Sequence, residues 1–128
     1  MNKEDLPLIP GVIADYYYDP SGILYSFSND KQRTVENIRD NIALVKKITG
    51  NKKVPLLVFL KRSPVPDKAT RKFSTNQLPE VYTAMAMVSK PGLSAFIMKL
   101  LFHLNPPPIP MRSFSNEEEA KEWLMPYR

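Results

Sequence analysis

The chain has 128 residues and a formal net charge of +5, and 43% of its residues are hydrophobic and 24% charged. These values are typical of one ordinary soluble domain, expected over residues 1–128, and the absence of cysteine excludes a disulfide framework, a thiolate nucleophile and a cysteine metal site. Because the sequence has neither an apolar N-terminal leader nor an apolar stretch long enough to cross a bilayer, we expect a cytoplasmic protein without a transmembrane segment.

The first predicted element is a β-hairpin. Residues 12–18 and 22–28 are rich in aromatic and branched side chains, and the Asp-Pro-Ser-Gly sequence at 19–22 favours a type I turn between them. Because alternate residues of a strand lie on opposite faces, Ser26 and Ser28 share one face of the second strand. We expect this serine face to be the wetter side of the hairpin.

The next segments predict a helix, a buried strand and a second helix. Thr34 is a suitable N-cap for the first helix, apolar residues then recur at spacings of three and four, and Gly50 ends it. The continuous apolar run at 54–60 is typical of a strand covered on both faces, so we place it near the centre of the sheet. A short, polar helix is expected over residues 67–76.

The C-terminal half predicts a strand, an apolar helix, a short strand and a last helix. Small side chains alternate within residues 81–88 and favour the close approach of a helix, and the helix that follows Pro91 has two apolar rows. We expect the first row to face the sheet and the second row to need a cover. The first row is Leu93, Phe96, Ile97, Leu100, Leu101 and Leu104, and the second row is Ala95, Met98 and Phe102.

A proline-rich connection precedes the last strand, which is expected over residues 111–114. Ser115 and Glu118 then have the spacing of a capping box for the final helix. The complete order of elements is β-β-α-β-α-β-α-β-α. It predicts an α/β domain with a five-stranded, mixed and mostly parallel sheet, because parallel strands need crossover helices between them.

This order resembles the STAS domain, a family that includes bacterial anti-sigma-factor antagonists and cytoplasmic domains of sulfate transporters. The sequence PPPIPMRSF at 106–114, followed by EEAKEWL at 118–124, is also similar to the ending of small bacterial proteins grouped with STAS and Sec14-like folds. The resemblance implies a non-catalytic regulatory or protein-interaction module. The similarity to Sec14-like proteins implies an alternative function, the binding of a lipid or another apolar small molecule.

The resemblance also implies a position for a phosphorylation switch, at the start of the helix after the third strand. Asp67 matches the family's aspartate there, but Lys68 and Ala69 take the place of its hydroxyl residue. The switch is therefore expected to be lost, with Thr70 as the remaining candidate beside Lys68 and Arg71. The interpretation that we prefer is that Asp67 caps the helix.

The sequence contains no visible catalytic, cofactor-binding or metal-binding arrangement. His103 is the single histidine, the aspartates have no spacing that pairs two carboxylates, and the four glycines are too dispersed for a phosphate-binding loop. The basic residues lack the interleaved aromatic residues of single-strand readers, so nucleic-acid binding is not expected. We expect a protein that is not an enzyme and holds no cofactor or metal.

Two functional hypotheses remain. In the first, the domain binds a protein partner or a second copy of itself through a sheet edge or through the second row of the third helix. In the second, this row borders a cavity for an apolar small molecule, with Met85 and Met87 nearby, since methionine suits adaptable surfaces. The alternative to both is that the loop 61–66 and the polar second helix simply cover the row.

Overall fold

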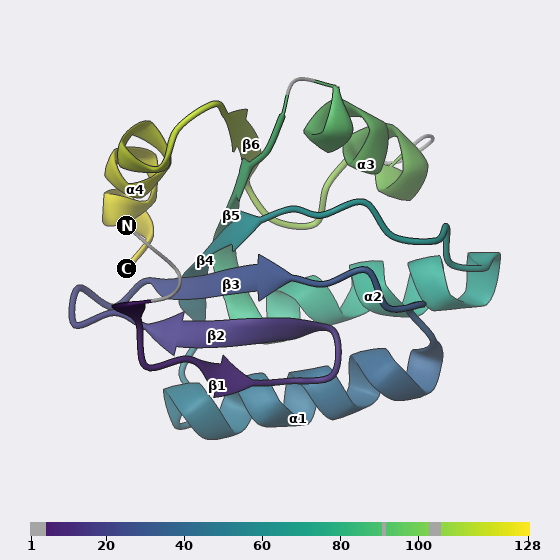
Figure 1. Cartoon of the computed structure of the whole chain (residues 1–128), viewed down its shortest axis with the longest axis horizontal. Helices are drawn as coiled ribbons and strands as arrows, with labels where there is room; N and C mark the ends of the chain where they lie inside the picture. The colour runs from purple at the N-terminus through teal and green to yellow at the C-terminus, as the bar shows by residue number, and fades with distance from the viewer. Residues whose placement is uncertain (1–4, 91, 103–105) are drawn as a thin grey trace.

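The computed structural model describes residues 5–90, 92–102 and 106–128, which form a six-stranded sheet with helices on both sides (Figure 1). The strands follow one another across the sheet in chain order; β1 to β3 pair antiparallel, and β3 to β6 pair parallel. The predicted α/β architecture with a mixed, mostly parallel sheet is confirmed. The elements are β1 (Ile9–Pro10), β2 (Ala14–Tyr18), β3 (Leu24–Ser28), α1 (Val35–Thr49), β4 (Val54–Phe59), α2 (Lys68–Val81), β5 (Tyr82–Val88), α3 (Leu93–Phe102), β6 (Met111–Phe114), α4 (Glu117–Leu124) and the 3₁₀ turn η2 (Met125–Tyr127).

The prediction of five strands missed β1. This strand has two exposed residues, Ile9 and Pro10, which pair antiparallel with Tyr16 and Asp15 of β2. A segment this short has no alternation to detect, and proline is tolerated in a sheet mainly at an edge such as this one. Because β1 extends the sheet beyond β2, it leaves the predicted order of the other strands unchanged.

Strand β4 lies inside the sheet, between β3 and β5, as its apolar sequence predicts. Parallel neighbours bond it on both sides, and Leu57 at its centre is 0% exposed. Because helices cover both faces at this point, successive residues of β4 are buried whichever way they point.

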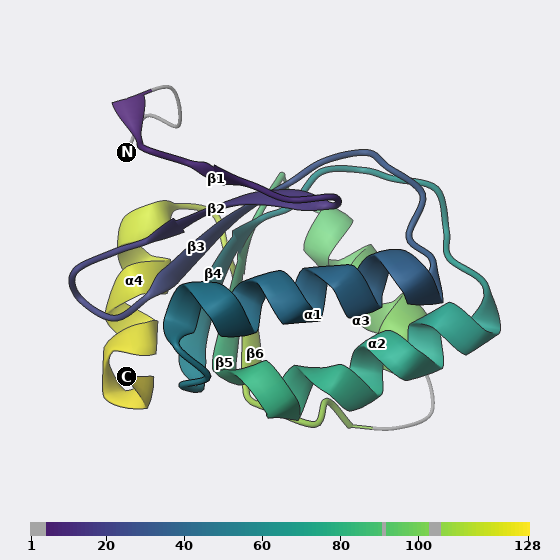
Figure 2. The ribbon, with the colours of Figure 1, turned by 90° about the horizontal axis from the view of Figure 1, so that it is seen from below.

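The helices divide unequally between the two faces of the sheet. Figures 1 and 2 show α4 on one face, which we call the α4 face, and α1, α2 and α3 on the other, which we call the three-helix face. Each face has its own hydrophobic core, one containing Leu57 and Leu124 and the other Tyr16 and Met87. Within the described parts of the chain, no helix combines the length and the hydropathy needed to cross a bilayer.

Capping residues fix most helix boundaries. The hydroxyl of Thr34 accepts a hydrogen bond from the backbone N–H of Asn37, and Gly50 ends α1 in the left-handed region at φ 63°, both as predicted. At α4 the predicted cap is wrong by one residue. Asn116, and not Ser115, accepts the bond from the third residue of the helix, because an asparagine side chain caps as well as a serine.

The second helix is longer than predicted. It runs to Val81 and not to Asn76, with Pro79 inside its last turn. Polar residues and a proline favour an earlier end, but Leu78 and Val81 lie three residues apart and are both buried. Their burial against the sheet outweighs the weak local preference.

Candidate functional site

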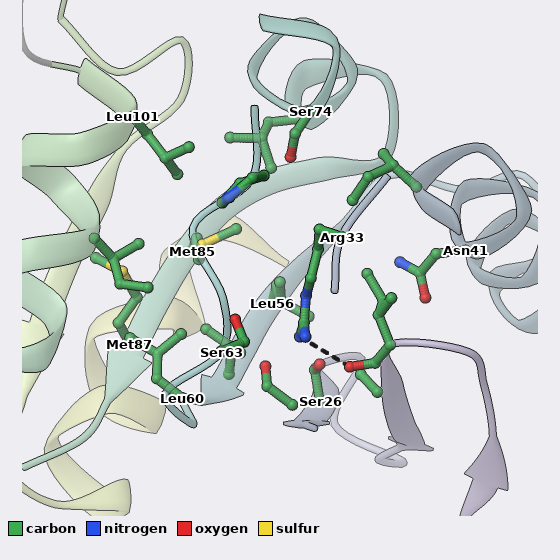
Figure 3. A pocket seen from close by; sticks show the side chains of 18 of the residues that line it. Ser26, Arg33, Asn41, Leu56, Leu60, Ser63, Ser74, Met85, Met87 and Leu101 are labelled. Atoms are coloured by element: carbon green, nitrogen blue, oxygen red, sulfur yellow. Dashed lines mark hydrogen bonds between the residues drawn. The ribbon is translucent and has the colours of Figure 1, made fainter. Parts of the chain in front are cut away.

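A pocket of about 210 Å³ lies on the three-helix face, between the sheet and the helices α1, α2 and α3 (Figure 3). We call it the sheet pocket. Its lining includes Ser28, the last residue of β3, and Leu60 and Lys61, which follow β4. The pocket therefore extends to the carboxyl ends of two parallel strands, where open α/β sheets usually hold their ligands.

The floor of the sheet pocket is apolar. Leu56 and Val58 point into it from β4, and Met85 and Met87 from β5. Residues two apart share a face of a strand, so each strand contributes a pair. Figure 3 shows these methionines in the same half of the pocket as Leu101 of α3. The methionines lie where the ligand hypothesis expects them.

The side chains of α3 that line the pocket belong to the first apolar row, and not to the second row that the ligand hypothesis names. Of the second row, Ala95 is exposed, whereas Met98 and Phe102 pack against the hydrophobic core, and none of the three lines the pocket. The wall consists of residues from the first row, namely Ile97, Leu100 and Leu101.

The orientation of α3 about its axis is also evident at two other residues. Phe96, a member of the row expected to face the sheet, is 47% exposed, and the polar residue Ser94 is buried. The periodicity of a helix shows which residues share a face, but a helix that is apolar on several sides has no unique orientation. Packing against α2 and the sheet therefore decides which row turns inward.

The half of the pocket formed by β3 and α1 contains several polar groups beside the apolar side chains of Ile38 and Ile42. The hydroxyl of Tyr16 donates a hydrogen bond of 2.7 Å to Oδ1 of Asn41. Burial raises the pKa of Tyr16 and of Tyr82 nearby, which keeps both phenols neutral. Ser26 is 4% exposed and Ser28 is half-buried, whereas Ile23, Tyr25 and Phe27 on the opposite face are buried, so both faces of β3 are largely covered and the serine face is the slightly more exposed one.

Arg33 brings a positive charge into this polar half (Figure 3). Its Nη1 donates to the carbonyl oxygens of Asn29 and Lys31, at 2.7 Å and 2.6 Å, and its Nη2 donates to that of Ile13 at 3.0 Å. Partial burial lowers the pKa of Arg33, although the nearby charge of Asp30 opposes this effect. A guanidinium remains charged in proteins, so Arg33 is a fixed cation in the pocket wall.

Two further cations, Lys61 and Arg71, complete the polar part of the wall. Lys61 is exposed after β4, and Arg71, in the first turn of α2, donates through Nη1 to the carbonyl oxygen of Pro66 at 2.7 Å. The lining contains no aspartate or glutamate among the described residues. The pocket thus combines an apolar floor with a cationic wall.

The positions of the implied phosphorylation switch lie at the edge of this pocket. The carboxylate of Asp67 accepts a bond of 2.8 Å from the backbone N–H of Thr70, which holds the pKa of Asp67 below its usual value, so Asp67 does cap the helix. Lys68 and Ala69 are exposed. Thr70 is 2% exposed and lines the sheet pocket, whereas the other three do not.

Sequence analysis did not identify Arg33 and Lys61 as pocket residues. They come from two different connections, one before α1 and one after β4, and line the same pocket because β3 and β4 are parallel and end at the same edge of the sheet. One local signal was present: serines at alternate positions of β3, on the face that helices cover. His103, the single histidine, lies outside the described residues.

Two comparisons with known proteins found a match, and one of them, to a solved structure, bears on the fold. A family model described as "Domain of unknown function (DUF7793)" matches residues 16–128. The chain is also similar to the crystal structure of an uncharacterized protein of the DUF3478 family from Shewanella loihica PV-4, which has a SpoIIAA-like fold. The TM-score is 0.61 at 14% identity, over 91% of this chain and 95% of the other. No curated protein matches.

The likeness to the Shewanella protein shows the fold alone, because the two sequences are only 14% identical. The SpoIIAA-like, and hence STAS-like, fold expected from the order of elements is confirmed. The family model that matches, however, is not a named STAS family.

Proposed function

This chain belongs to the DUF7793 family, and we propose that it binds a lipid or another apolar small molecule in the sheet pocket without catalysing a reaction. The observation that carries the proposal is a cavity of about 210 Å³ with an apolar floor on one face of the sheet. Protein interiors are normally packed without large gaps. A concave apolar site with a few polar groups around it is the usual form of a small-molecule site.

The chemistry of the lining supports binding without catalysis. Among the described residues, the pocket has no aspartate, glutamate, histidine or cysteine in its wall. Its hydroxyl groups, such as those of Ser26 and Ser63, therefore have no carboxylate, imidazole or thiolate of the lining beside them to act as a general base. Tyr16 and Tyr82 stay neutral because burial raises the pKa of each.

The test fills the pocket with a large side chain introduced on α2. Ser74 lines the pocket, and Asn76 lies exposed on the same helix and does not line it. Ser74→Trp is expected to weaken the binding of the neutral, apolar dye Nile red at least about tenfold, because the indole fills the cavity. Asn76→Trp adds the same side chain outside the pocket and is expected to bind the dye like the wild type.

Dye fluorescence and native mass spectrometry of the purified protein measure this directly. Mass spectra of the wild type are expected to show a co-purified apolar molecule that Ser74→Trp lacks. Binding of Nile red that is equal in the wild type, Ser74→Trp and Asn76→Trp would contradict the proposal.

A protein-interaction module is the second candidate, and the exposed face of α3 favours it. Ala95 and Phe96 are exposed there, whereas Met98 and Phe102 pack against the core. If this face binds a second copy, the apparent mass measured by light scattering rises with protein concentration, and Phe96→Glu abolishes the rise without changing the far-UV circular dichroism. A monomer at all concentrations would reject self-association through this face.

A further inference from the structure

We infer that the molecule bound in the sheet pocket is an amphiphile with an oxyanion head, a carboxylate or a phosphate, on an apolar chain. The inference rests on the proposed function, because it names the class of ligand for the same pocket. Its basis is the charge of the wall: Arg33, Lys61 and Arg71 line the pocket, and no acidic residue in the described part of the chain does. The charges of Asp30 and Asp67 act on Arg33 and Arg71 from outside the pocket, but neither carboxylate lines it, so the lining itself is cationic and attracts an anion.

The guanidinium of Arg33 is already ordered and has a donor left for such a head group. Three carbonyl oxygens, those of Ile13, Asn29 and Lys31, fix its guanidinium through Nη1 and Nη2. Within the described residues, its Nε makes no hydrogen bond, so at least one donor of the guanidinium is left for a ligand. A guanidinium that is already ordered loses little side-chain entropy when it binds a carboxylate or phosphate.

Lys61 and Arg71 supply the remaining charge from the connection between β4 and α2 and from the first turn of α2. Both have long side chains whose apolar stems can cover the pocket while the charged ends meet the head group. Asp67, the nearest acid along this segment, is engaged as the cap of α2 and does not line the pocket. Among the described residues, the wall therefore contains three cations and no carboxylate.

The two halves of the pocket give the ligand its direction. Arg33, Ser26 and Asn41 lie in the half formed by β3 and α1, and Met85, Met87 and Leu101 in the half formed by β5 and α3 (Figure 3). A free phosphate would leave the apolar half empty, and a neutral lipid would leave the cations of the wall without an anion inside the pocket. A molecule with an anionic end and an apolar chain satisfies both halves.

The first experiment compares different head groups on alkyl chains of the same length. Dodecanoate, dodecyl phosphate, dodecanol and dodecyltrimethylammonium, with inorganic phosphate as the head alone, compete with Nile red for the full wild-type chain at low ionic strength. At least one of the two anions is expected to bind about tenfold more tightly than dodecanol, because charge-assisted hydrogen bonds form only with the anion. The stronger of the two identifies the head as a carboxylate or a phosphate.

The second experiment removes the charges that are least involved in folding. Lys61→Gln combined with Arg71→Gln is expected to weaken the preferred anion about tenfold and to leave dodecanol unchanged. The matched control combines Arg62→Gln with Lys72→Gln, which removes two exposed charges next to these positions but outside the pocket lining. This control is expected to bind every ligand like the wild type, apart from a small general charge effect.

The outcomes separate this inference from the proposed function. If dodecanol competes as well as both anions, and the Lys61 and Arg71 variant changes neither, the oxyanion head is wrong while apolar binding stands. If inorganic phosphate competes as strongly as dodecyl phosphate, the site binds an anion and not an amphiphile. If neither Nile red nor any of the dodecyl compounds binds, the proposed function is wrong and the inference is wrong with it.

Discussion

The two faces of the sheet differ in how completely their helices fill the space above the strands. On the α4 face, Ala84, Ala86 and Leu124 are all 0% exposed, and small residues bring the helix close to β5. On the three-helix face, α1, α2 and α3 leave a pocket of about 210 Å³ between them. Since interiors are usually close-packed, the face that keeps a gap is the one able to accept a ligand.

The α4 face is also secured at the C-terminal end of the chain. Trp123 contacts the rings of Phe114 and Tyr127, and the hydroxyl of Thr83 donates to the carbonyl oxygen of Tyr127 at 2.8 Å. Under the proposed function, the two faces have a division of roles: the α4 face stabilises the sheet, and the three-helix face provides the space for the ligand. Matched substitutions on the two faces test this division.

The largest difference is expected from removing a leucine side chain on each face. Leu124→Ala opens a cavity in a packed core and is expected to lower the free energy of unfolding by about 3 kcal/mol. Leu101→Ala only enlarges an existing pocket from a partly buried position and is expected to cost about 1 kcal/mol. Urea unfolding followed by circular dichroism measures both; equal losses would show that the two faces are packed alike.

The opposite change, an added side chain, is expected to have the second largest effect. Ala86→Leu overfills the α4 face and is expected to cost about 2 kcal/mol, because Ala86 is fully buried in the core of this face. Ser74→Leu adds a side chain of the same size beside the sheet pocket and is expected to cost less than about 0.5 kcal/mol. The same urea titrations compare the two, and a large loss for Ser74→Leu would mean that the pocket has no room.

The N-caps of one helix on each face differ in their response to acid. Asp67→Ala at α2 and Asn116→Ala at α4 are each expected to lower the free energy of unfolding at neutral pH, because each removes the acceptor for a backbone N–H. The hydrogen bond from Thr70 lowers the pKa of Asp67 from 3.8, so its stabilisation is present above that value and is lost as the pH falls through the lowered pKa.

The effect of Asp67→Ala should therefore shrink in acid, whereas that of Asn116→Ala should persist. Unfolding curves of the wild type and both variants at neutral pH and below pH 3.8 measure this difference. A constant effect of Asp67→Ala across this range would show that the charged carboxylate is not what caps α2.

The sequence predicts the framework of the fold better than the site within it. The apolar run of β4, the caps Thr34 and Asp67 and the small residues of β5 act through local or repeating patterns, and the structure confirms them. The pocket depends on which face α1 covers and which row of α3 turns inward. Both are set by packing between distant segments, and a period of two or 3.6 residues shows only which side chains share a face.

Two buried tyrosines give the smallest and most specific contrast between the faces. The hydroxyl of Tyr16, on the three-helix face, donates to Asn41, whereas that of Tyr25, on the α4 face, is buried without a hydrogen-bond partner among the described residues. Tyr16→Phe is expected to cost about 1 kcal/mol, and Tyr25→Phe is expected to cost nothing or to stabilise slightly, because it removes an unsatisfied polar atom. Urea unfolding at neutral pH measures both, and a loss for Tyr25→Phe equal to that for Tyr16→Phe would mean that the Tyr25 hydroxyl does have a partner.

Alkaline pH sharpens the contrast further. Burial raises the pKa of Tyr25 above 10.0, so the folded protein keeps this proton where the unfolded chain begins to lose it. The stability that depends on the neutral phenol is complete below pH 10.0 and decreases as the pH rises above it. Because phenylalanine cannot ionise, the stability of Tyr25→Phe relative to the wild type should rise above this pH. A difference that stays constant across pH 10.0 would show that Tyr25 titrates equally in both states and is therefore not shielded by the α4 face.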